Sequence, residues 1–230
     1  MDKIEENAAI GMSLLSERAR LELIMAAGEL FIKHGKNDVR LLEIAAGHGE
    51  SLEDVYCLFG GEDGLWDAVV EYAAQPWAAD PFGEFARKNE SLLSSRSGQE
   101  LMIFMMVELL FKKMLDKSRP RWCMKLMARM LFGEAMPSQR ITEAYRDSVI
   151  AAFVKLYARI TGNYEQNAAF CWSMAIMAPA YMLADVQADK PFADENGSSI
   201  ERNLMYMTAK NALFNAGLVD GMAPLPQLMD

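Results

Sequence analysis

Apolar residues recur at spacings of three and four positions along almost the whole chain. This spacing gathers them on one face of an α-helix, whereas a half-buried strand requires strict alternation of apolar and polar residues. No run of strict alternation bounded by turn residues is found in the sequence. The pattern therefore predicts an all-α chain. The expected helices cover residues 17–34, 39–46, 51–58, 62–74, 99–117, 120–135, 137–162, 163–187 and 198–217.

Glycines and capping residues separate the short helices in the first third of the chain. Gly35, the Gly47-His48-Gly49 turn and Gly60-Gly61 each stop a helix, since glycine adopts the left-handed conformation in which helices commonly end. Ser51 is expected to cap the third helix, and Asn37 or Asp38 the second.

The segment 75–100 differs in composition from the helices on either side. It is rich in Pro, Gly, Ser and Asp, so we interpret it as an irregular connection or weak helix. Three parts are thus predicted: a head at 1–75, a larger helical domain at 76–217, and a disordered tail at 218–230.

The head contains a recognisable motif. The segments AAGELFIKHG and LLEIAAGHGESLEDVYCLFGGEDGLW together resemble the head of the TetR family of transcriptional regulators. The resemblance implies a TetR-repressor-like fold with a three-helix head and a helix-turn-helix, whose recognition helix begins after Ser51 and enters the major groove. It also implies DNA-binding roles, with phosphate contacts from Ser51 and Tyr56. The implied DNA-binding residues are Arg40, Ser51, Leu52 and Tyr56.

The larger domain carries a vaguer likeness. The segments LMARMLFGEAMPS and FVKLYARITG resemble the TetR branch with a CecR-type C-terminal domain. This implies a ligand-binding and dimerisation domain, with a homodimer formed through the last two long helices. A small molecule bound there would change the spacing of the two heads.

Charge separates the head from the rest. Residues 1–75 hold 6 Lys and Arg against 15 Asp and Glu, whereas residues 76–230 hold 17 against 17. Residues 41–75 contain eight acids and no Lys or Arg. Because phosphate neutralisation by bases supplies most non-specific DNA affinity, this composition disfavours operator binding. Two functions stay open: a small-molecule-responsive regulator, or a TetR-fold protein that has lost DNA binding and acts by contacting a basic protein partner or by binding a ligand.

Methionine is frequent, with 18 residues, many of them in the expected long helices. Thioether side chains adapt to irregular shapes, so they favour either a pocket for an apolar effector or ordinary core packing. The pocket hypothesis places eight residues around such an effector. They are Met105, Met106, Leu109, Met127, Phe132, Phe170, Met174 and Tyr181.

Other functional classes find little support in the sequence. We find no phosphate loop, no G-x-S-x-G and no C-x-x-C, so we expect neither an enzyme nor a bound cofactor. His48 and Cys57 lack a third metal ligand at fixed spacing, and three cysteines far apart fit reduced thiols. No apolar run is expected to span a membrane, and the acidic N-terminus is unlike a signal peptide, so we expect a cytoplasmic protein.

Overall fold

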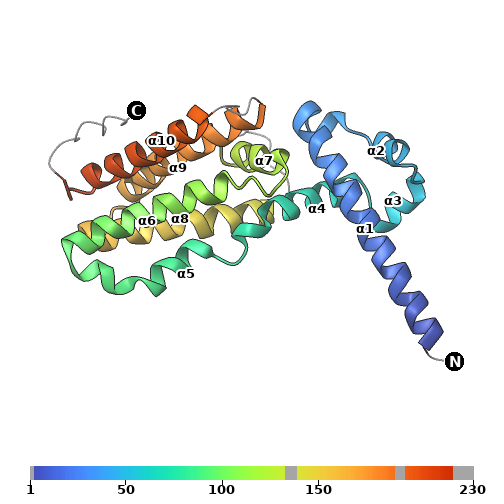
Figure 1. Cartoon of the computed structure of the whole chain (residues 1–230), viewed down its shortest axis with the longest axis horizontal. Coiled ribbons are helices and arrows are strands. Elements are labelled where there is room, and N and C mark those ends of the chain that lie inside the picture. The colour runs from blue at the N-terminus through green and yellow to red at the C-terminus, as the bar shows by residue number, and fades with distance from the viewer. Residues whose placement is uncertain (1–2, 133–138, 190–194, 220–230) are drawn as a thin grey trace. The chain divides into compact units, whose positions relative to one another are not determined.

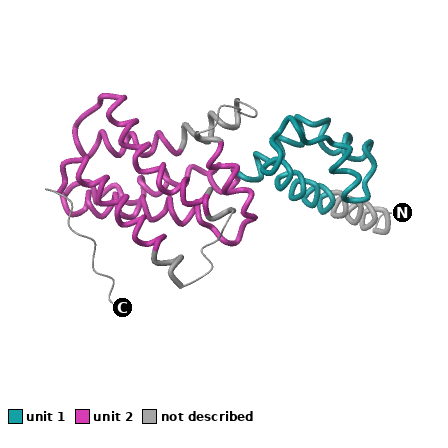
Figure 2. The backbone as a smooth tube through the Cα atoms, turned by 90° about the horizontal axis from the view of Figure 1, so that it is seen from above, with its two compact units in different colours: residues 1–73 teal, residues 74–230 magenta. Residues whose placement is uncertain are grey.

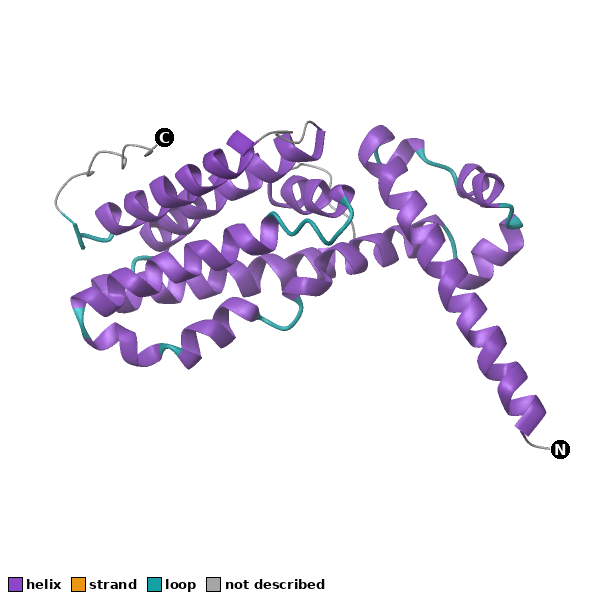
Figure 3. Cartoon of the chain, in the orientation of Figure 1, coloured by secondary structure: helices purple, strands orange, loops and turns teal. Residues whose placement is uncertain are grey.

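The computed structural model describes residues 3–132, 139–189 and 195–219, with side chains described within 17–129, 149–184 and 200–219 and at Val186. Every regular element in this described part is a helix, as Figure 3 shows. The prediction of an all-α chain is therefore confirmed. Two compact units make up the chain, residues 1–73 and 74–230 (Figure 2).

The first unit holds the four predicted helices, but the first begins well before residue 17, and the second runs on through Gly47 and His48 instead of ending at residue 46. They are α1 at Lys3–His34, α2 at Leu41–His48, α3 at Leu52–Phe59 and α4 at Glu62–Ala74, whose last residue belongs to the second unit (Figure 1). A 3-10 turn, η1, occupies Lys36–Asp38, and Arg40 is the N-cap of α2 with no side-chain capping bond. The expectation that Asn37 or Asp38 caps α2 is therefore wrong, because both residues lie inside this turn.

The head core forms where its helices meet. Phe31 of α1 and Trp66 of α4 pack edge to face with ring centroids 4.7 Å apart. Ile44 of α2 and Val55 of α3 are almost completely buried. Gly49 and Gly60 follow α2 and α3 with φ of 71° and 76°, the left-handed conformation expected for these turns. This core fixes α2 and α3 against α1 and α4.

The second unit is a bundle of longer helices. They are α5 at Pro81–Lys88, α6 at Arg96–Met114, α7 at Arg121–Phe132, α8 at Gln139–Thr161, α9 at Gln166–Asp189 and α10 at Glu195–Asn215. Helix α9 packs against α6, α7, α8 and α10. The segment expected to be irregular or weakly helical contains α5 between two 3-10 turns, η2 at Gln75–Trp77 and η3 at Glu90–Ser94.

A chain of aromatic rings connects α5 to the bundle. Trp77 stacks on Phe82 at 5.9 Å, Phe82 contacts Phe153 of α8 at 5.5 Å, and Phe153 contacts Trp172 of α9 at 6.4 Å. The Trp172 indole Nε1 donates a hydrogen bond of 3.0 Å to the carbonyl of Ala212 in α10. These contacts hold the short helix α5 against α8, which positions the groove described below.

The chain stays packed beyond the end of α10. Arg96, at the start of α6, donates a hydrogen bond of 3.1 Å from Nε to the carbonyl of Leu218, whose side chain is buried. Disorder was expected from residue 218 onward, but Leu218 belongs to the packed bundle. Residues 220–230 of that predicted tail lie outside the described residues.

One described segment, Gln166–Ala184 of α9, is long and apolar enough to cross a bilayer by length and composition alone. Half of its 18-residue window is buried inside the bundle. The core helix of a water-soluble bundle would meet the same criteria of length and composition.

Candidate functional site

Helix α3, which is expected to be the recognition helix, projects both apolar and acidic side chains into solvent. Leu52 and Tyr56 are 40% and 54% exposed, and Ser51 is also exposed. Glu53 and Asp54, on the same helix, are exposed as well. The residues expected to contact DNA are thus accessible, but they share their surface with carboxylates that repel phosphate.

Ser51 is engaged by its own helix. The Asp54 backbone N–H donates a hydrogen bond of 3.1 Å to Ser51 Oγ. The Ser51 backbone N–H donates a hydrogen bond of 3.3 Å to Asp54 Oδ2. The Ser51 hydroxyl also donates to Asp54 Oδ2. This capping box confirms the expected cap and explains why an acid stands at Asp54, near the positive end of the helix dipole. The Ser51 hydroxyl proton is therefore already used within the head.

Two ion pairs join the base-carrying segment before α2 to the start of α4. Lys36 Nζ lies 2.7 Å from Asp63 Oδ1, and Arg40 Nη1 lies 3.7 Å from Glu62 Oε2. The hydrogen bond from Lys36 lowers the pKa of Asp63, with the lysine charge acting in the same direction. Arg40, the base expected to contact DNA, therefore has an acid beside it.

Most described bases of the head have such internal partners. Arg18 Nε lies 2.9 Å from Glu22 Oε1, and the Arg20 guanidinium lies 5.4 Å from the centre of the Phe59 ring. Lys33 is exposed near the end of α1. Three of the five bases in the described residues 17–73, Arg18, Lys36 and Arg40, thus pair with acids of the head, whereas Arg20 and Lys33 do not.

The eight residues expected to line an apolar pocket are not similarly placed. Met106, Met127 and Tyr181 are buried in the bundle core. Met105, Leu109 and Met174 are half-buried, whereas Phe170 is 47% exposed. The side chain of Phe132 lies outside the described residues. The structure thus distributes the seven described members between the core and the surface.

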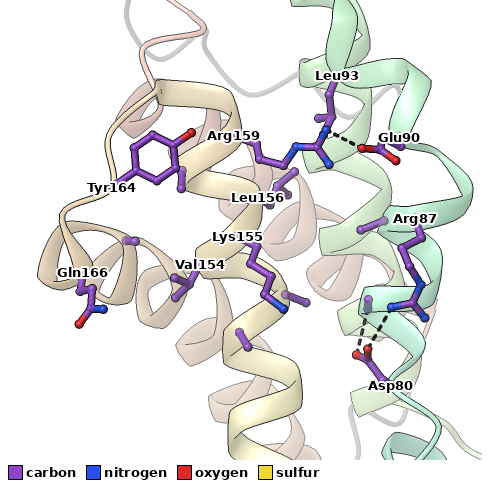
Figure 4. A pocket seen from close by; sticks show the side chains of 16 residues that line it. Asp80, Arg87, Glu90, Leu93, Val154, Lys155, Leu156, Arg159, Tyr164 and Gln166 are labelled. Atoms are coloured by element: carbon purple, nitrogen blue, oxygen red, sulfur yellow. Dashed lines mark hydrogen bonds and ion pairs between the residues drawn. The ribbon is translucent and has the colours of Figure 1, made fainter.

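A groove of about 640 Å³ runs between α5 with η3 on one side and α8 on the other (Figure 4). Small side chains leave this space open. They are Ala86 of α5 and Ala151, Ala152 and Ala158 of α8. This volume falls within the range of small-molecule sites, roughly 300–1,000 Å³.

Charged residues of both walls line the groove. Arg87 Nη1 lies 3.6 Å from Asp80 Oδ2, and Arg159 Nη2 lies 2.7 Å from Glu90 Oε1. Lys155 extends from α8 into the space between these pairs, as Figure 4 shows, and it has no acidic partner among the described residues. The groove thus holds three bases and two acids.

The sequence analysis missed this groove. Arg87, Lys155 and Arg159 belong to segments far apart in the chain, and α5 lies in a stretch interpreted as irregular or weakly helical. The alanines along α8 could have indicated the groove, because small side chains mark where two helices approach closely or leave a hollow between them.

Helices α9 and α10 each leave apolar side chains exposed. Met182 and Val186 of α9 are 66% and 51% exposed, and Cys171 lies on the same face. Ile200 and Phe214 of α10 are 41% and 48% exposed and share a face, because about four helical turns separate them. Neither face has a partner within the described chain.

The three cysteines are free thiols in different surroundings. Cys57 and Cys171 are exposed, whereas burial raises the pKa of Cys123 to about 11. Within the described residues, no group of three or more His, Cys, Asp and Glu side chains could hold a metal ion.

Solved structures resemble this chain, whereas no protein-family model and no curated protein matches it. Mycobacterium smegmatis AmtR is 16% identical over 86% of this chain and 92% of its own, with a TM-score of 0.51. A putative TetR-family transcriptional regulator from Mesorhizobium loti MAFF303099 is also 16% identical, over 86% of this chain and 96% of its own, with a TM-score of 0.47. The likeness to AmtR at this identity concerns the fold, and the chain has the all-α, TetR-like fold.

Proposed function

We propose that this chain is a cytoplasmic transcriptional regulator that acts as a homodimer and responds to a small molecule bound in its second unit. The observation that carries the proposal is the TetR-like combination of a helix-turn-helix head with a separate helical body. A regulator of this kind needs an effector that prefers one spacing of the two heads, because a ligand with equal affinity for both states shifts nothing.

The exposed faces of α9 and α10 support a homodimer. Two copies related by a two-fold axis would bury Met182, Val186 and Phe214 against the same residues of the partner copy. Met182→Lys is then expected to shift the protein from dimer to monomer in sedimentation velocity, because a buried, unpaired charge is destabilising. Leu101→Lys, which changes an exposed residue of α6, is the matched control and should leave the dimer intact.

Cysteine labelling gives a second test of this interface. Cys171 lies on the α9 face, so dimerisation should protect it from a thiol reagent at high protein concentration and expose it on dilution. Cys57 of α3 should react quickly at either concentration. Equal labelling rates of Cys171 and Cys57 at high concentration would contradict a dimer through α9.

A second candidate function is favoured by the ion pairs of the head. Lys36 and Arg40 are paired with Asp63 and Glu62, and α3 exposes Glu53 beside Tyr56. A surface of this composition suits a basic protein partner better than DNA, since complementary charge speeds association and selects partners. The chain would then have kept the TetR-like fold and lost operator binding.

Selection of DNA from fragmented genomic DNA of the source organism separates the two functions. The purified full-length protein is mixed with the fragments at low salt, and the bound DNA is sequenced. Enrichment of an inverted-repeat site supports the regulator, because a two-fold dimer reads two half-sites. Recovery of no enriched site would overturn the regulator and leave the partner-binding candidate.

A further inference from the structure

The α5–α8 groove combines a small-residue floor with a surplus base. Ala151, Ala152 and Ala158 leave room beside α8 where larger residues would close the space. Lys155 extends into that room from the same helix. An occupant would therefore meet apolar surface and a positive charge together.

The walls of the groove are fixed at two points. Phe82 of α5 contacts Phe153 of α8 at 5.5 Å, and Glu90 of η3 pairs with Arg159 of α8 at 2.7 Å. The ring contact is buried and holds α5 against α8 without a ligand, whereas the ion pair is half-exposed and adds little. A preformed hollow binds small molecules with less loss of conformational entropy than a site that must be ordered first.

The charge arrangement selects an anion. Arg87 and Arg159 are each balanced by an acid, Asp80 and Glu90, so the surplus charge of the groove resides on Lys155. An ammonium is a point charge with three donors, which suits a single carboxylate. A ligand with one negative group would balance the surplus, whereas a cation would meet repulsion.

We propose that the α5–α8 groove binds an elongated organic carboxylate, with its carboxylate on Lys155 and its alkyl body along the alanines of α8. This proposal gives a ligand class to the effector of the proposed regulator. Only the role of the ligand as an effector rests on the proposed function, whereas its binding in the groove does not. The site differs from the Met-rich pocket expected from the sequence, because none of the seven members of that set whose side chains are described lines this groove.

Isothermal titration of the full-length protein with decanoate, and with decanol as its uncharged analogue, tests the assignment. Decanoate is expected to bind saturably, and Lys155→Met should weaken it about five- to tenfold, as expected for loss of a partly exposed charge-assisted contact. The affinity of the wild type for decanol should be no higher than the affinity of Lys155→Met for decanoate, because each combination lacks one of the two charges. Lys88→Met removes a lysine of α5 that pairs with Glu84 and does not line the groove, so it should leave the affinity unchanged.

Filling the groove gives an independent variant. Ala158→Leu adds a larger side chain to the groove and should abolish decanoate binding, with an unchanged circular dichroism spectrum showing that the protein folds. Absence of saturable decanoate binding by the wild type would overturn the proposal, as would equal affinity in Lys155→Met or undiminished binding in folded Ala158→Leu. If the protein binds decanoate but enriches no DNA site, the regulator function is refuted and the groove proposal stands. If it enriches a DNA site but does not bind decanoate, the groove proposal is refuted and the regulator function stands.

Discussion

In the head, Lys36 and Arg40 each lie beside an acid at the start of α4, whereas in the body Arg87 and Arg159 each lie beside an acid that lines a groove. The difference between the two regions is the charge left over. The head has 6 bases against 15 acids in residues 1–75, so its pairs leave a strongly negative surface. In the groove the pairs leave Lys155 in surplus. A regulator with a TetR-like fold is expected to meet phosphate with its head, but among the described residues the acids of the head outnumber its bases, whereas the bases of the groove outnumber its acids.

The largest expected effect comes from breaking the body. Phe153→Ala removes a buried ring that contacts both Phe82 and Trp172, so we expect a loss of about 3–5 kcal/mol in unfolding free energy. Decanoate binding should be lost with it, because α5 loses its apolar anchor. Urea unfolding followed by tryptophan fluorescence measures the change. Phe170→Ala, at a ring that is 47% exposed, is the control, and an equal loss in both variants would contradict this account of the body core.

The next largest effect is expected from a substitution that destabilises the head at the α3–α4 junction. A Cβ added at Gly64 would lie 1.7 Å from the carbonyl oxygen of Phe59, so Gly64→Ala should destabilise the head by about 3 kcal/mol, the upper end for overpacking. Because Glu62 and Asp63 flank this junction, their pairs with Arg40 and Lys36 should loosen too.

A glycine in open space provides the control for that variant. A Cβ at Gly47 of α2 meets nothing within 4 Å, so Gly47→Ala is expected to stabilise the head by about 0.5–1 kcal/mol. Thermal unfolding by circular dichroism compares the two variants. Similar stability of both would show that the close approach at Gly64 is relieved at little energetic expense.

A smaller effect sharpens the electrostatic contrast. Glu62→Lys removes the acid beside Arg40 and adds a base at the start of α4, so non-specific DNA affinity at low salt should rise about tenfold, with a salt slope steeper by roughly 2. Glu71→Lys makes the same charge change further along α4, away from Arg40. An equal gain from both variants in a duplex titration would mean that total charge, rather than the release of Arg40, sets the affinity.

The smallest effect concerns the pH dependence of the Lys36–Asp63 pair. Because the folded pKa of Asp63 is below its ordinary value of 3.8, the pair contributes stability above that pH and loses it as pH falls through the lowered pKa. Asp63→Asn should therefore show a flatter fall in stability below about pH 4 than the wild type. Asp67→Asn, also on α4, is the control for charge alone. The effect is small because water screens an exposed pair.

The sequence predicted the head well because its signals are local. Ser51 and Gly60 mark helix ends through residues adjacent in the chain, and the structure has α3 between them as expected. Helix α2 ends before Gly49, two residues later than predicted. The pairing of Lys36 with Asp63 joins residues far apart in sequence, so only the folded head reveals that its bases have partners.

The body was harder to predict because its functional features depend on which helix faces meet. Methionine spacing could not separate core from cavity, and Met106 and Met127 proved to be core residues. The groove depends on α5 lying beside the alanines of α8, and the sequence of α5 resembles a loop because Pro81 and Gly83 occur in it. The long helices were thus predictable, whereas α5 and the contacts that shape the groove were not.

The most direct test of the charge contrast is fluorescence anisotropy of a labelled random duplex titrated with the full-length wild-type protein, first at low salt and then as salt is raised. If the bases of the head are held by its own acids, the duplex should remain unsaturated at micromolar protein even at low salt, and added salt should change little. Micromolar binding that weakens steeply with salt would contradict the account, because it would show that the head presents enough free positive charge to neutralise several phosphates.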